Sequence, residues 1–153
     1  MARTDAATRV IPANTEQVYA ALTTSEALVA WLPPDGMTGT FDRFDPRVGG
    51  GYRLVLTYED PGAVGKSTRD TDVVDARFVD LVPPRLIVQA VEFVSDDAAY
   101  AGTMTMTWEL TPVDGGTRVD IRAADVPPGI SAADHAAGMA ASLSHLATYL
   151  ERP

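Results

Sequence analysis

The stretch "SAADHAAGMAASLSHLATYLE", residues 131–151, decides the fold. Ser131 and Asp134, three residues apart, resemble a capping box in which Asp replaces the usual Glu or Gln. Apolar residues then recur every three or four positions on one face: Met139, Leu143, Leu146 and Leu150. The pattern predicts one long amphipathic helix from Ser131 to about Glu151, and its apolar face has to pack against another layer.

The preceding part of the chain supplies that layer, because apolar and polar residues alternate there with the period of a β-strand. The alternation is clearest in "TMTMTWEL", residues 103–110, which places on one face Met104, Met106, Trp108 and Leu110. Other strands are predicted at 7–13, 39–45, 52–59, 68–82, 85–94 and 117–124. The connections between them are short, and Asp114-Gly115-Gly116 is typical of a hairpin loop, so neighbouring strands should be antiparallel.

Two short helices are predicted between the first strand and the next, in "NTEQVYAALT" (14–23) and "TSEALVAWL" (24–32). The second helix should end at Pro33, because the residue before a proline avoids the α conformation. The triple glycine 49–51 opens a strand and lacks the Lys-Ser/Thr of a phosphate loop, so a tight turn or bulge is expected. "PGAVGKS", residues 61–67, is predicted to be a loop.

These segments predict an α+β fold in a single domain, residues 1–153. A curved antiparallel sheet of about six to seven strands should wrap around the long C-terminal helix, with two short helices after the first strand.

Composition narrows the classes of function. The formal net charge of −9 disfavours binding to nucleic acid or to an anionic membrane surface. The chain has no cysteine, which removes disulfides and thiolate sites. No apolar run is long enough to insert into a membrane, and no secretory signal is visible, so a cytoplasmic location is expected. No metal or cofactor is predicted, and the two histidines are too far apart on the last helix to share a metal.

Four local patterns occur in the order of a known family: "VYAALTTSEALVAWLPP" (18–34), "FDPRVGGGYRL" (44–54), "VDLVPPRLI" (79–87) and "GMAASLSHLATYLE" (138–151). With the order of elements, they resemble the START-like helix-grip superfamily, also called Bet v 1-like or SRPBCC. Within it, the chain is most similar to the branch named for the activator of Hsp90 ATPase. The family often has Gly-Trp where this chain has Gly138-Met139, which would leave a roomier or more adaptable pocket.

The resemblance implies an apolar cavity between the concave face of the sheet and the last helix. The side chains expected to face it are Tyr52, Leu54, Leu56, Phe78, Met104, Met106, Trp108, Met139 and Leu143. The short helices should bring Trp31 and Met37 to its rim. The alternative for each of these residues is ordinary core packing.

No catalytic constellation is evident from spacing. The candidates for catalysis are His135, near the start of the last helix, and Asp72, if its side chain turns inward. The alternative for His135 is a half-buried histidine that hydrogen-bonds locally, for example with Asp134. The alternative favoured for Asp72 is a solvated strand end; an inward Asp72 could also form an ion pair with Arg53 or be a polar anchor for a ligand. His145 and Asp75 are expected to be solvated.

Three functions remain in view. The first is binding of a small apolar molecule as a carrier or sensor. The second is a cavity-based enzyme of the polyketide cyclase or dehydratase type, in which Tyr52 and Tyr100 would also be candidates. The third is stimulation of Hsp90. Binding is favoured over catalysis, and stimulation of Hsp90 is the least favoured of the three. A half-apolar outer face on the strand at 68–82 would allow a homodimer.

Overall fold

The computed structural model describes residues 3–59 and 71–151. The loop expected at 61–67 and the start of the strand expected at 68–82 lie outside the described residues. The elements are β1 (Thr4–Ile11), α1 (Thr15–Thr23), α2 (Ser25–Trp31), β2 (Met37–Phe44), β3 (Gly51–Tyr58), β4 (Thr71–Val82), β5 (Leu86–Val94), the 3-10 turn η1 (Ala98–Tyr100), β6 (Met104–Val113), β7 (Gly116–Ala124) and α3 (Ala132–Leu150).

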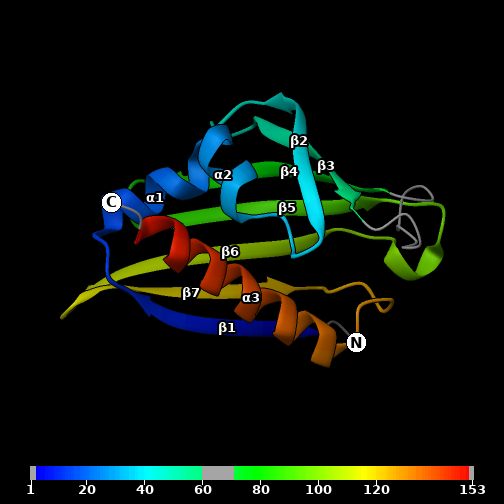
Figure 1. The fold of residues 1–153 in the computed structure, drawn as a ribbon. Coiled ribbons are helices and arrows are strands. Elements are labelled where there is room, and N and C mark those ends of the chain that lie inside the picture. Colours follow the sequence, from blue (N-terminus) through cyan, green and yellow to red (C-terminus); the bar gives the residue numbers. More distant parts are fainter. Residues whose placement is uncertain (1–2, 60–70, 152–153) are drawn as a thin grey trace.

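The strands form one antiparallel sheet in the order β1-β7-β6-β5-β4-β3-β2, as Figure 1 shows. Strands β2 to β7 follow one another as neighbours, and β1 pairs with β7, Thr4 opposite Ala124. The helices α1 and α2 carry the chain from β1 at one edge to β2 at the other. Across residues 3–59 and 71–151, this confirms the predicted α+β class, with seven strands and with two short helices after the first strand.

Local interactions define the two short helices, and α1 begins at a side-chain cap. The Asn14 side chain accepts a hydrogen bond from the Gln17 amide at 2.8 Å, and the Gln17 side chain accepts one from the Asn14 amide at 3.0 Å, a complete capping box. Helix α2 ends at Trp31, close to the predicted stop before Pro33. The Trp31 indole nitrogen donates to the Ala21 carbonyl oxygen at 2.9 Å and so ties α2 to α1.

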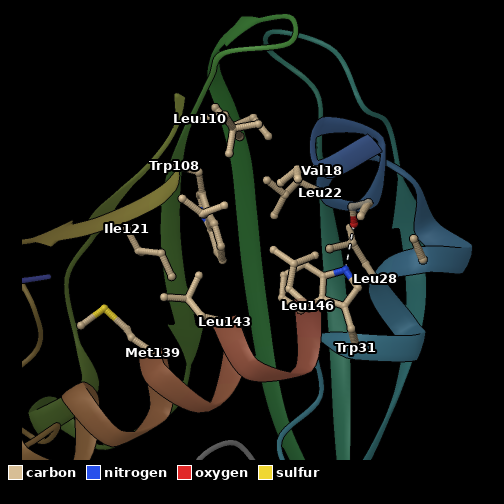
Figure 2. Close-up of a cluster of buried hydrophobic side chains, with 14 of the residues drawn as sticks. Val18, Leu22, Leu28, Trp31, Trp108, Leu110, Ile121, Met139, Leu143 and Leu146 are labelled. Atoms are coloured by element: carbon tan, nitrogen blue, oxygen red, sulfur yellow. Dashed lines mark hydrogen bonds between the residues drawn. The ribbon is translucent and has the colours of Figure 1, made fainter. Parts of the chain in front are cut away.

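Helix α3 crosses the concave face of the sheet (Figure 1), and its N-terminus is capped by Ser131, whose hydroxyl oxygen accepts from the Asp134 amide at 3.0 Å. Figure 2 shows Met139, Leu143 and Leu146 projecting from α3 into the space between sheet and helices. At the end of this core near α2, the rings of Trp31 and Trp108 pack edge to face, with 6.0 Å between their centroids. The predicted apolar stripe of the helix therefore anchors it to the sheet.

The triple glycine forms a tight approach between strands rather than a ligand loop. Gly49 has a φ of +84°, which favours glycine. A Cβ added at Gly51 would lie 2.0 Å from the Ala76 carbonyl oxygen of β4. The register between β4 and β5 also shifts between Phe78 and Asp80, as it does at a β-bulge.

Within the described ranges, no helix combines the length and the apolar character that crossing a membrane requires.

Candidate functional site

A cavity of about 260 Å³ lies between the inner face of the sheet and α3. Seven of the residues expected to face it do line it: Tyr52, Leu54, Leu56, Met104, Met106, Trp108 and Met139. They come from β3, β6 and α3, at alternating strand positions and on the buried stripe of the helix. The alternation in the sequence therefore identified the correct face of the sheet.

Four expected residues do not line this cavity. Phe78 and Leu143 are each 1% exposed and belong to the packed core. Trp31 is 2% exposed, so it lies in the core and not at the rim. Met37 lines a separate surface groove of about 500 Å³, on the other side of the segment that contains Pro33 and Pro34. The short helix thus seals the core with its tryptophan, while the residues that follow it, Leu32 and Pro34, reach the cavity wall.

Sequence reasoning also missed lining residues. On the sheet these are Val74, Gln89, Val91, Phe93 and Ile121, and on α3 they are Gly138 and Ser142. His135, the catalytic candidate near the start of α3, lines the cavity as well. Two of the sheet residues could have been found from the sequence. Gln89 and Val91 follow Ile87 at every second position of β5, so the three lie on the same face of the sheet. The three helix positions are spaced by three and four residues, the pattern of one helix face.

One polar pair stands inside the cavity. The Gln89 amide nitrogen donates to the Tyr52 hydroxyl at 3.4 Å, and both residues are buried. Burial raises the pKa of Tyr52 to about 12, and the hydrogen bond with Gln89 lowers it only in part. The Tyr52 hydroxyl is therefore neutral at physiological pH and serves as a hydrogen-bonding group.

His135 lies at the cavity and is held by an unexpected partner. Its Nδ1 atom is 2.7 Å from an Asp5 carboxylate oxygen on β1, and Arg3 binds the same oxygen at 3.0 Å. Asp134, the neighbour considered from sequence, instead gives its backbone amide to the Ser131 cap. Burial acts to raise the pKa of Asp5, but hydrogen bonds from His135 and Arg3 outweigh it and lower that pKa. The carboxylate is thus ionised and fixes the orientation of the imidazole.

Asp72 turns inward, but it does not line the cavity. It is 3% exposed and accepts a hydrogen bond from the Tyr58 hydroxyl at 3.1 Å. The expectation of a solvated strand end is therefore wrong for Asp72, and the alternative ion pair with Arg53 is not formed. Arg53 instead binds both oxygens of Asp75, at 2.7 and 2.8 Å, because the two residues are directly opposite in the β3–β4 register.

His145 is partly exposed, at 25%, as expected for a solvated side chain, and its Nε2 atom lies 3.2 Å from a carboxylate oxygen of the exposed Asp35. Tyr100 lies in η1, where its ring contacts Phe93, and it does not line the cavity. Among the described residues, no three histidine or acidic side chains gather as metal ligands would.

Known structures share this architecture. A protein from Chromobacterium violaceum is 30% identical, with a TM-score of 0.86 and coverage of 98% of both chains. A protein from Rhodobacter sphaeroides is 25% identical, with a TM-score of 0.79 and coverage of 98% of this chain and 97% of that one. DynU16, from the dynemicin biosynthetic locus, is 19% identical with a TM-score of 0.71; it shares the fold over 97% of this chain and 47% of its own.

No curated protein matches this chain in sequence. The family described as "Activator of Hsp90 ATPase homolog 1-like protein" matches residues 12–151, which include both short helices, the meander and α3. The match covers nearly all of the elements that build the cavity, and the chain therefore belongs to the family of activator of Hsp90 ATPase homolog 1-like proteins.

Proposed function

We propose that the protein binds a small, largely apolar molecule in the cavity between the sheet and α3, as a carrier or sensor. The observation that supports this most directly is the cavity itself, about 260 Å³ in volume and lined mainly by aliphatic, aromatic and methionine side chains. Folds of this family commonly bind small ligands. Typical ligand pockets hold roughly 300–1,000 Å³, so this cavity lies just below that range and the expected ligand is small.

Physical reasoning favours an occupant over an empty space. Protein interiors are close-packed, and an apolar void forfeits contacts that its lining side chains would otherwise make. Apolar cavities of the 150 Å³ class stay dry and accept small aromatic molecules. Met104, Met106 and Met139 add flexible side chains that adapt to different shapes.

Methionine methyl groups offer a direct test. With carbon-13 in the methyl groups, Met104, Met106 and Met139 report on the cavity, and Met37 in the outer groove is an internal control. Titration with naphthalene should shift the three cavity signals by a saturable amount and leave Met37 unchanged. If the four signals move together, or none moves, the cavity does not bind this class of molecule.

A second function, catalysis in the same cavity, is favoured by one observation. The Nδ1 atom of His135 contacts Asp5, which leaves the Nε2 atom to accept a proton from a substrate in the cavity. A histidine oriented in this way can act as a general base. Turnover would be measured on a panel of aromatic and polyketide-like substrates, with wild type and His135→Gln. An equal rate for both proteins, or no turnover in either, would rule this function out for those substrates.

A further inference from the structure

The inner face of β5 carries one polar residue in the middle of an apolar surface. Ile87, Gln89 and Val91 alternate on that face, and Gln89 is only 7% exposed. Its register partner on β6 is Met106, so Gln89 lies well inside the sheet and not at a strand end. A buried amide needs hydrogen-bond partners, because losing its hydrogen bonds to water without replacement costs free energy, and apolar neighbours cannot replace them.

The protein itself supplies few of those partners. The Gln89 amide nitrogen reaches the Tyr52 hydroxyl at 3.4 Å, which is long for a hydrogen bond. Among the described residues, this is the side-chain hydrogen bond that Gln89 forms. In the same part of the chain, every polar side-chain atom that is sealed from solvent has a hydrogen-bond partner. The rest of the amide is therefore accessible, and since Gln89 lines the cavity, it is accessible from there.

The cavity is otherwise without charge. Its described lining contains no Asp, Glu, Lys or Arg, and His135 and Tyr52 are its titratable groups. A carboxylate or an ammonium group beside Gln89 and Tyr52 would find no Asp, Glu, Lys or Arg in the described lining as an ion-pair partner, and His135 is already engaged by Asp5. Burying an unpaired charge is strongly unfavourable. The polar group that fits Gln89 and Tyr52 is consequently a neutral one.

We propose that Gln89 and Tyr52 form a polar anchor inside the cavity, and that the ligand is a small neutral alcohol or phenol whose hydroxyl binds there while its apolar part contacts the methionines. A hydroxyl both donates and accepts, so it matches the Gln89 amide in either orientation and the Tyr52 hydroxyl as well. This inference rests on the proposed function and adds the chemical class of the ligand.

An alternative is that the pair only stabilises the core. A single 3.4 Å contact is a weak reason to keep two polar groups buried, because replacing both partners of a buried hydrogen bond by apolar groups is often neutral or stabilising. A recognition role explains both the length of the contact and the accessible amide. The two explanations differ in what they predict for ligand preference.

The test compares 1-naphthol with naphthalene, which share an apolar body and differ by one hydroxyl. Both affinities are measured by the methionine methyl titration, in wild type and in Gln89→Leu. We expect the ratio of the naphthalene dissociation constant to the 1-naphthol dissociation constant to fall about tenfold in Gln89→Leu, since the leucine leaves the hydroxyl unpaired. Affinity for naphthalene itself should be kept or rise. Comparing this ratio between wild type and variant cancels the difference in hydration of the two free probes, which is the same for both proteins.

Tyr52→Phe is the second variant, and it decides the question if Gln89→Leu does not fold. It removes one hydroxyl at nearly constant shape and should lower the same ratio. An unchanged ratio in the folded variants, with both probes still bound, would overturn the polar anchor and leave the proposed function standing. Failure of both probes to shift the cavity methionines of the wild type would remove the proposed function and the anchor with it.

Discussion

Gly138 allows a sharp test of how the cavity mouth is built. It lies within α3, lines the cavity and is exposed, and a Cβ added there would meet no atom within 4 Å. Gly138→Ala should therefore act through helix propensity alone and raise the free energy of unfolding by about 1 kcal/mol. For a chain of this size, that corresponds to a rise of roughly 2–4 °C in the unfolding temperature.

Thermal unfolding followed by circular dichroism measures that rise, and urea unfolding checks that the change in free energy has the same sign. Binding is measured on the same protein by the methyl titration with naphthalene, which should change less than about twofold because one methyl group leaves the mouth open. A fall in the unfolding temperature of Gly138→Ala would refute the reasoning, since it would mean that a Cβ at this position is not free.

The matched variant Gly138→Trp places a large side chain at the same open position. We expect it to fold, because the position is exposed, and to weaken naphthalene binding by at least about tenfold, or 1.4 kcal/mol, by obstructing the mouth. Equal affinity for the Ala and Trp variants would show that ligands do not pass this part of α3.

Two further predictions concern the frame around the site. Trp31→Phe should lower the free energy of unfolding by about 2–4 kcal/mol, because it leaves the buried Ala21 carbonyl oxygen unpaired and opens space in the core. Urea unfolding measures this loss, and a loss below about 1 kcal/mol would contradict the prediction. Hydrogen bonds from Arg53 lower the pKa of Asp75 in the folded protein. The stability that this pair contributes is therefore present above the pKa of Asp75 in the unfolded chain, near 3.9, and is lost as the pH falls through its pKa in the folded protein. Asp75→Asn should thus flatten the acid side of the stability curve below about pH 4, and an acid side as steep as that of the wild type would count against the pair.

The architecture followed from the sequence because each of its parts has a local cause. The apolar stripe of residues 131–151 and the alternation of Met104, Met106 and Trp108 are visible without tertiary information. The same alternation contains Gln89, whose inward position is as readable as that of its apolar neighbours. The inward register of Gln89 was thus a readable signal for the polar anchor proposed above.

Other parts of the site depend on distant packing. Trp31 belongs to a short helix whose orientation is set by its contact with α1 and with Trp108, so its depth could not be read from spacing. The contact between His135 and Asp5 joins residues 130 positions apart and requires the β1–β7 pairing. Phe78 and Leu143 show the same periodicity as the lining residues, and neighbouring side chains alone decide that they border no space.

The pairing of β1 with β7 also governs when the molecule can fold. Thr4 has its partner at Ala124, so β1 cannot take its place in the sheet until β7 has also been synthesised. Such non-local contacts make folding slow, and until they form, β7 presents an open edge to other chains. A nascent or truncated chain without its first strand should therefore be prone to aggregation, which makes the N-terminal segment as important for yield in the cell as α3 is for the cavity.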